Sequence, residues 1–251
     1  MDKTPLPILI LALLVLFPRP LPAQDKKPLI CGTDLEGGVP YLFLVGDKEN
    51  PKNVAGFEVD LMDSLAKELG RPIVRQHASF QNLLATLDRG DIDFAMNGIE
   101  ITPKNRRLAS FTRPYYFYQL QLIARGDDDR FKCLADCANQ ELKVGTLSES
   151  AAARLLEETK GVTLKPYDDQ EGPFKDLTNK RIDAVLFDLP IALYYAVEDD
   201  HIEHRKKDYP GLKLVGQPFA EGEYGIAVKL GNDELRKERS CLPFSTQNGV
   251  G

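Results

Sequence analysis

The chain has 251 residues, of which 43% are hydrophobic, so it is long enough for two modest domains with apolar cores. Its formal net charge is −6, and it lacks the basic face that nucleic-acid binding requires. This balance excludes a nucleic-acid-binding protein, whereas an acidic chain can still bind cations or zwitterions at one local site.

The N-terminal segment has the pattern of a secretory signal. Residues 8–17 form an uncharged apolar run, which is shorter than the roughly 20 residues that a membrane-spanning helix needs. We therefore predict that residues 1–23 are a signal peptide cleaved after Ala23, which places the protein in the periplasm. The alternative is a buried N-terminal helix. We find no other stretch that is apolar enough to span a membrane.

The first half of the chain alternates short apolar strands with amphipathic helices, and glycines end the helices. Its predicted elements are, in order, a strand at 29–33, a helix at 57–69 ended by Gly70, a strand at 72–76, a helix capped by Ser79 and ended by Gly90, and a strand at 92–96.

The second half repeats this plan. Its predicted elements are a strand at 142–146, a helix that Ser148 caps and that ends at Glu158, a strand at 162–167, a helix at 174–180 and a strand at 182–187. The repeat is also visible in the letters, because LDRGDIDFAM begins at Leu87 and LTNKRIDAVL begins at Leu177. Each copy ends in an apolar strand that polar residues follow.

Short alternation of strands and helices predicts an α/β fold. We predict two lobes, because the extended segments 111–124 and 212–230 suit strands that cross between them. Lobe 1 is residues 28–115 plus 218–240, and lobe 2 is residues 116–217. Ligands of such sheets bind beyond the carboxyl ends of the strands, so the turns after both repeated strands should line one cleft. The alternative is a single larger sheet.

The cysteines and histidines indicate no metal and no cofactor. Cys133 and Cys137 lie four residues apart in a polar loop and can form a disulfide in an oxidising compartment. No second CxxC or HxxxH pair completes a zinc site. The remaining members of these two types are dispersed and receive no role: Cys31, Cys241, His77, His201 and His204.

Opposite charges flank the turn in AMNGIEITPKNRRLASFTRPYY, which runs from Ala95 to Tyr116. Glu100 precedes the pair Arg106 and Arg107 by six residues. Charges fixed around a turn in this way can hold a small zwitterion, or they can be ordinary surface charges.

An ordered set of motifs over residues 30–235 resembles the periplasmic amino-acid-binding proteins of ABC importers. The motifs are GFEVDLMDSLAKELG, GDIDFAMNGIEITP, FTRPYY, KVGTLSES and RIDAVLFD, at the spacing of that family. The resemblance implies a type II periplasmic binding fold, in which each lobe is a mixed, mostly parallel sheet flanked by helices and two strands join the lobes. The sequence is also similar to binding domains that are fused to a permease of the glutamine type.

The resemblance also implies a binding site. In the family, an arginine after the IT turn and backbone N–H groups hold the α-carboxylate of the ligand, and an aspartate after a lobe 2 strand holds its ammonium. Asp188 matches that aspartate, Asp34 meets the ligand side chain, and Phe80 forms an apolar wall. Alternatively, Asp34 caps a turn, and Ser150 can cap the second helix start as well as contact the ligand. Carried over position by position, the ligand-binding residues are Asp34, Phe80, Gly98, Glu100, Thr102, Arg106, Ser150 and Asp188.

Three positions depart from the family pattern. The usual arginine position holds Asn105, and we predict that the adjacent Arg106 replaces it. Glu100 stands where serine or threonine is common, and it can bind an ammonium group, bind a cationic side chain together with Asp34, or pair with a nearby lysine. An aromatic residue expected near position 37 is absent, with Tyr41 and Phe43 as candidate substitutes.

The C-terminal residues depart from the family as well. Pro243 ends the helical pattern, and residues 241–251 form an atypical tail. One or two further helices that cover lobe 1 in the family are missing here, which we interpret as truncation or a shifted reading frame.

We expect an exported, monomeric receptor that closes around a small amino acid, polar or basic by preference, and delivers it to an ABC transporter permease. It would catalyse no reaction. The alternatives are a periplasmic dehydratase of the cyclohexadienyl or prephenate type, which shares this fold, and the binding domain of a receptor or permease fusion.

Overall fold

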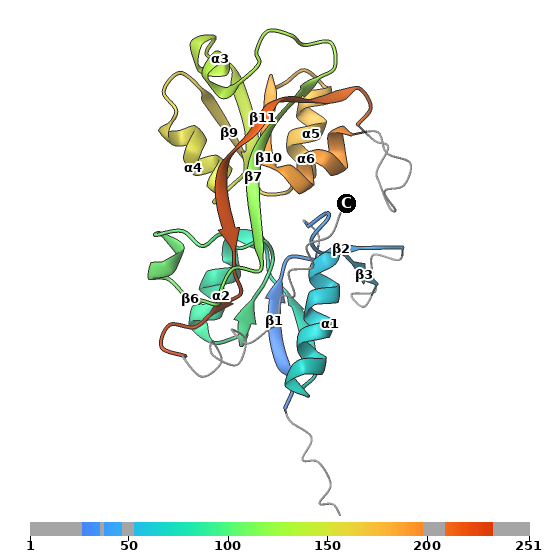
Figure 1. Ribbon diagram of the computed structural model, residues 1–251, viewed down its shortest axis with the longest axis vertical. Coiled ribbons are helices and arrows are strands. Elements are labelled where there is room, and N and C mark those ends of the chain that lie inside the picture. Colours follow the sequence, from blue (N-terminus) through green and yellow to red (C-terminus); the bar gives the residue numbers. More distant parts are fainter. Residues whose placement is uncertain (1–26, 36–37, 47–52, 198–208, 233–251) are drawn as a thin grey trace, which may run out of the picture.

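The protein has two lobes joined by a pair of long strands (Figure 1). The computed structural model describes residues 27–35, 38–46, 53–197 and 209–232. Each lobe contains one five-stranded sheet, so the predicted two-lobe α/β fold is confirmed and the alternative of a single larger sheet is wrong. The predicted signal peptide, the atypical tail and the missing C-terminal helices all lie outside the described residues.

The sheet of lobe 1 has the strand order β4-β1-β5-β12-β6. The second strand in this order, β1 (Leu29–Thr33), is parallel to both of its neighbours, and β12 pairs antiparallel with both of its own. The other strands are β4 (Ile73–His77), β5 (Phe94–Ala95), β12 (Ala227–Val228) and β6 (Ser110–Phe111), and β2 (Phe43–Leu44) and β3 (Val54–Ala55) form a separate small hairpin.

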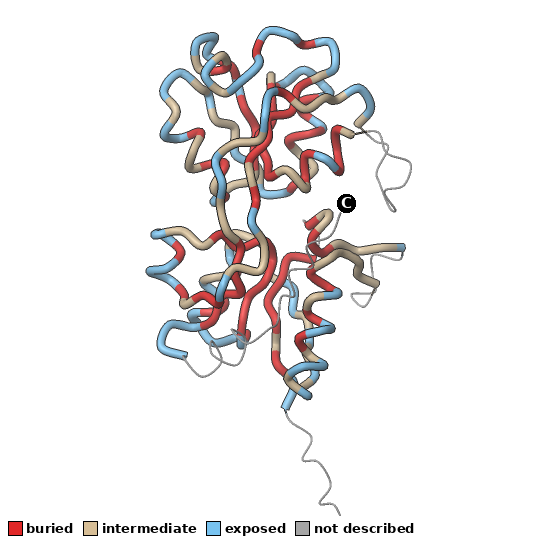
Figure 2. The backbone as a smooth tube through the Cα atoms, viewed as in Figure 1, coloured by how far each residue is buried: buried red, intermediate tan, exposed pale blue. Residues whose placement is uncertain are grey.

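Alternating side chains of this sheet build two cores, because successive residues of a strand face opposite sides. Leu29 and Cys31 of β1 pack with α1 (Phe57–Leu69) on one face. On the other face, Ile30 packs with α2 (Leu83–Arg89) and with the short 3₁₀ helix η1 (Phe80–Asn82) that precedes α2. Figure 2 shows the buried backbone concentrated in the strands at the middle of each lobe.

The sheet of lobe 2 has the order β11-β7-β10-β8-β9. Like the first sheet, it has two parallel and two antiparallel pairings. Its strands are β7 (Tyr116–Arg125), β8 (Lys143–Leu147), β9 (Thr163–Tyr167), β10 (Ala184–Asp188) and β11 (Leu212–Tyr224), and its helices are α3 (Leu134–Asn139), α4 (Ala151–Glu158), α5 (Glu171–Thr178) and α6 (Leu189–Ala196).

Helix ends follow the sequence signals at two glycines and depart from them at two serines. Gly70 and Gly90 end α1 and α2 in the left-handed conformation, as predicted. The prediction that Ser79 caps the second helix is wrong, because α2 begins after Asn82 and Ser79 precedes η1 without a side-chain cap.

The prediction that Ser148 caps the first helix of lobe 2 is wrong, because the N–H of Ala153 donates to Oγ of Ser150 at 3.1 Å. Ser148 instead contacts Asp168, with 3.4 Å between its Oγ and Oδ1 of the aspartate.

The strands β7 and β11 pair antiparallel from the Tyr116–Tyr224 end to the Arg125–Leu212 end. They belong to the sheet of lobe 2, and Figure 1 shows them running on toward lobe 1. β11 continues through a short turn into β12 of the first sheet. The crossing segments are therefore confirmed, while the division between lobes at residues 115/116 and 217/218 stays a prediction.

Gly56, directly before α1, holds the loop that carries Tyr41. Its φ is 126°, a value that side chains rarely tolerate. A Cβ at this position would lie 2.1 Å from the carbonyl oxygen of Tyr41, which also accepts the N–H of Glu58 at 3.0 Å. The entry to α1 and the position of Tyr41 therefore depend on the absence of a side chain here.

We expect Gly56→Ala to lower the free energy of unfolding by about 3 kcal/mol or more, because strain and a backbone clash act together. The matched control is Gly46→Ala, since Gly46 also has positive φ but has no atom near the added methyl group. That variant should lose about 1 kcal/mol. Urea denaturation of both variants measures the difference, and equal losses would contradict the role of the Tyr41 contact.

Candidate functional site

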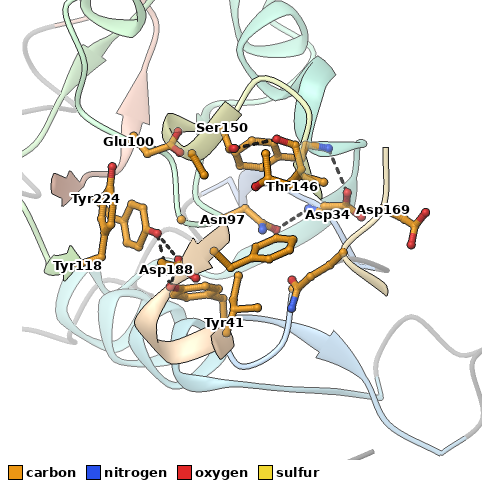
Figure 3. Close-up of a pocket in the computed structure, with 18 of the residues that line it drawn as sticks. Asp34, Tyr41, Asn97, Glu100, Tyr118, Thr146, Ser150, Asp169, Asp188 and Tyr224 are labelled. Atoms are coloured by element: carbon orange, nitrogen blue, oxygen red, sulfur yellow. Dashed lines mark hydrogen bonds between the residues drawn. The ribbon is translucent and has the colours of Figure 1, made fainter. Parts of the chain in front are cut away.

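A cavity lies between the two lobes, where polar residues follow the strands of both sheets (Figure 3). Asp34 follows β1, Gly98 follows β5, Ser150 follows β8, and Asp188 ends β10. The carboxyl ends of parallel strands form the usual ligand edge of an open α/β sheet. Both lobes therefore present this edge to one shared space.

Asp188 is 7% exposed and lies where the two lobes and β11 meet. The hydroxyl groups of Tyr41 and Tyr224 both donate to its Oδ2, whereas Oδ1 accepts no hydrogen bond from the described residues. Burial raises the pKa of Asp188 to about 6, although the two tyrosine hydrogen bonds oppose that rise. Oδ1 is buried in this arrangement, and a cationic donor placed beside it would give the carboxylate a partner that it lacks.

Aromatic rings form much of the wall around this carboxylate. The ring of Tyr118 stacks on that of Tyr224 with 4.4 Å between centroids, and Tyr41 meets Tyr224 edge-on at 5.6 Å. Phe80 and Phe187 also line the cavity. These surfaces suit the hydrocarbon part of a small solute, and their faces attract cations.

Asp34 lies in a network at the carboxyl ends of β1 and β5. The N–H of Asp34 and the hydroxyl of Thr33 both donate to Oδ1 of Asn97 at 2.7 Å. Oδ2 of Asp34 accepts the N–H of Phe80 at 3.0 Å. Asp34 therefore lines the cavity and also holds the turn that carries Phe80.

Glu100 is 6% exposed and reaches from lobe 1 to helix α4 of lobe 2. The N–H of Ala151 donates to its Oε1 at 2.7 Å, and Nη2 of Arg154 lies 3.9 Å from its Oε2. Burial raises the pKa of Glu100 to about 7, although both of these partners lower it. The predicted alternative of a pair with a nearby lysine is wrong, because Lys104 contacts Glu149 at 2.5 Å.

The turn at Gly98 depends on a fully buried acid of α1. Oε1 of Glu58 accepts the N–H of Gly98 at 2.8 Å and also the hydroxyl of Tyr115. Oε2 of Glu58 has no partner among the described residues. Burial raises the pKa of Glu58 to about 7. The glycine itself has φ 61°, so it adopts the left-handed conformation that the turn requires.

Two predicted site residues lie away from the cavity. Arg106 is exposed on the short helix η2 (Asn105–Arg107), so the prediction that it turns inward is wrong. Its neighbour Asn105 is buried instead, and its side-chain amide donates to the carbonyl oxygen of Glu100 at 2.9 Å. Thr102 does not line the cavity either, and its hydroxyl accepts the N–H of Asn105 at 3.1 Å.

The other six predicted residues are brought together at the cavity: Asp34, Phe80, Gly98, Glu100, Ser150 and Asp188. Their roles in binding stay predictions. Sequence reasoning offered Tyr41 as a substitute aromatic, and it lines the cavity, whereas Phe43 does not. It missed Thr146, Asp168, Tyr118 and Tyr224. The first two lie at the ends of predicted strands, so the signal that identified Asp188 was available for them.

Side chains also join the two lobes beside the cavity. Nε2 of Gln170 donates to the carbonyl oxygen of Val39 at 2.7 Å, and Nε2 of Gln81 donates to that of Asp168 at 3.1 Å. Together with the contact between Tyr41 and Asp188, these bonds connect the two lobes around the cavity.

The described residues contain no cluster of side chains that could hold a metal ion. Within the same residues, no helix is long and apolar enough to cross a membrane. Cys133 and Cys137 carry free thiols, so the disulfide that their spacing allows is not formed in this structure.

Comparisons with known proteins agree with this geometry. Residues 29–240 match the model of the bacterial extracellular solute-binding proteins, family 3. The L-cystine-binding protein TcyJ of Escherichia coli (strain K12) is 30% identical over 215 residues, which cover 85% of this chain and 75% of that protein.

Two solved structures share the fold. An ancestral arginine-binding protein bound to arginine superposes with a TM-score of 0.75 at 28% identity, covering 86% of this chain and 91% of the other. The ancestral amino acid-binding protein AncCDT-1, a precursor of cyclohexadienyl dehydratase, has a TM-score of 0.73 at 24% identity, covering 85% and 86%. At that identity the second likeness concerns the fold alone.

We expect Glu58→Gln to change the pH dependence of stability. The pKa of Glu58 rises from 4.5 to about 7 on folding, so its favourable contribution is complete below about pH 4.5 and is lost as the pH rises through about 7. The variant should therefore gain stability relative to the unaltered protein between about pH 5 and pH 8, by about 2 kcal/mol. Thermal unfolding across that range measures the gain. A difference that does not vary with pH would contradict the raised pKa.

Proposed function

This chain belongs to the bacterial extracellular solute-binding proteins of family 3, and we propose that it captures a small amino acid, polar or basic by preference, by closing its two lobes over it. It acts in the periplasm as a monomer and delivers the solute to the permease of an ABC transporter. It needs no cofactor and catalyses no reaction.

The observation that carries this proposal is the unpaired oxygen of Asp188. The carboxylate is buried at the junction of both lobes, and two tyrosine hydroxyls hold its other oxygen. An ammonium group placed against Oδ1 would restore the charge balance that burial removes. Since the site is formed from both lobes, such a solute also stabilises their closure.

The charge of the cavity supports a preference for basic solutes. Among the described residues, no lysine, arginine or histidine lines the cavity. Five acidic residues line it: Asp34, Glu100, Asp168, Asp169 and Asp188. A solved neighbour of this chain binds arginine. A cationic solute is attracted by this field, and the exclusion of water on closure strengthens the attraction.

The dehydratase alternative is less well supported. An enzyme that acts on prephenate-like diacids needs cationic groups that anchor two carboxylates, and the described lining provides none. Glu100 and Asp188 would repel such a substrate when ionised. If ultraviolet absorbance showed that the purified protein converts prephenate, the non-enzymatic proposal would be wrong.

The proposal predicts that Asp188→Asn weakens binding by about 10- to 100-fold, because the asparagine keeps the shape but loses the charged hydrogen bond. A thermal-shift screen of the twenty amino acids and small amines identifies the solute, and isothermal titration then measures the affinity. Arg106→Ala is the control, since its exposed side chain lies outside the cavity. Its affinity should stay within about twofold of the unaltered protein.

If Asp188→Asn binds the solute as tightly as the unaltered protein, Asp188 does not hold the ammonium group. If no amino acid or amine shifts the melting temperature, the proposed class of solute is wrong.

A further inference from the structure

The start of helix α4 offers backbone N–H groups and a partial positive charge, which suit a carboxylate. This position already holds a carboxylate of the chain itself. Oε1 of Glu100 accepts the N–H of Ala151 at 2.7 Å, and Oγ of Ser150 accepts the N–H of Ala153. A carboxylate of the solute would have to displace Glu100 to reach the same N–H.

Cationic partners for a solute carboxylate are also absent from the described lining of the cavity. Arg154 is the basic residue beside Glu100, and its Nη2 is buried without a hydrogen bond in the described structure. Nη2 lies 3.9 Å from Oε2 of Glu100, and Nη1 donates to the carbonyl oxygen of Glu149 at 2.8 Å. Lys104 pairs with Glu149 outside the cavity lining.

Acidic side chains lie at two separate ends of the cavity, and those of Asp34 and Asp169 also accept backbone N–H groups. Figure 3 shows Glu100 and Asp188 at one end and Asp34 and Asp169 at the other. Asp188, 7% exposed, leaves Oδ1 without a hydrogen bond in the described structure. The aromatic and apolar wall between the ends suits an aliphatic chain.

We propose that Glu100 occupies, with its own carboxylate, the place where the carboxylate of an amino acid would bind, so that the preferred solute is a small aliphatic amine with a second cationic group and no carboxylate. This inference rests on the proposed function for its cavity and its closure of the two lobes, and it replaces the amino acid of that proposal by an amine. The amine nitrogen contacts Asp188 beside Glu100, and the second cationic group lies toward Asp34 and Asp169.

The repulsion of a carboxylate explains the preference. The carboxylate of an amino acid bound at Asp188 would lie close to two buried acids, whose charge the guanidinium of Arg154 beside Glu100 offsets only in part. Such repulsion is strong where water is excluded. Burial raises the pKa of Glu100 to about 7 and that of Asp188 to about 6, so a positive charge placed beside either acid would favour its ionised form. A diamine or a guanidino-amine supplies that charge.

Two matched pairs of solutes test the inference by isothermal titration at about pH 7.5 and low ionic strength. Lysine is compared with 1,5-diaminopentane, and arginine with agmatine, since each pair differs by the carboxylate alone. We expect at least one of the two amines to bind about tenfold or more tightly than its amino acid.

The outcomes separate this inference from the proposed function. If each amino acid binds as tightly as its amine, or if another of the twenty amino acids binds more tightly than both amines, the inference is overturned while the proposed function stands. If neither the amines nor any amino acid binds, both are overturned.

Variants of Glu100 give a second readout. Glu100→Ser exposes the N–H of Ala151, so we expect weaker binding of the amine and tighter binding of the amino acid. Glu100→Gln keeps an oxygen at that N–H, so the affinity for the amine should fall while the affinity for the amino acid should not rise. A ratio of the two affinities that is unchanged in Glu100→Ser would overturn the inference.

Glu157→Gln is the matched control for the change in charge. Glu157 lies exposed on the same helix α4 and does not line the cavity. Both affinities should stay within about twofold of the unaltered protein. A change as large as that of Glu100→Gln would mean that long-range charge, rather than occupation of the helix start, sets the preference, and would overturn the inference.

Discussion

The buried carboxylate of Asp188 depends on parts of the chain that are far apart in sequence. Its acid comes from β10, while the hydroxyl groups that hold it come from the loop before β2 and from the end of β11. A buried negative charge without a cation is unfavourable, and the two tyrosines offset part of that penalty. The same contact joins lobe 1 to lobe 2. The contact that stabilises the buried charge of Asp188 is therefore also a contact that holds the two lobes together around the cavity.

In lobe 1, buried polar side chains behind the cavity lining hold the turn that carries Gly98 and Glu100. Glu58 lies behind the Gly98 turn and fixes its N–H, while Asn105 fixes the carbonyl oxygen of Glu100. These contacts leave the side chain of Glu100 directed across the cavity to α4. The turn that faces the solute is thus held from behind by uncharged and acidic groups rather than by a basic residue, which keeps the whole region negative.

Much of the fold could be predicted because its signals are local. The spacing of the apolar residues in 57–69 and the glycine that follows predict the same bounds for α1 as the structure has. The repeat of Ile-Asp before an apolar strand identifies two similar halves. The predictions that fail are those in which the role was assigned to one of two nearby residues. Ser150 rather than Ser148 caps α4, and Asn105 rather than Arg106 turns inward, because a single short turn sets each direction. Tyr224, at the end of β11, contacts Asp188 from 36 residues away in the chain, so no local pattern could identify it.

The pairing of β7 with β11 is interrupted on one strand. The register shifts between Val215 and Phe219 and again between Phe219 and Gly222, and Ala220 adopts φ 54°. Bulges of this kind raise local twist and remove cross-strand bonds, while the facing stretch of β7 continues without a break. The two strands that cross between the lobes are therefore joined less regularly between Val215 and Gly222 than elsewhere along their length. If the lobes open, this interrupted stretch can change its twist while the rest of both sheets keeps its pairing, and the side-chain bonds across the cavity would then oppose the opening.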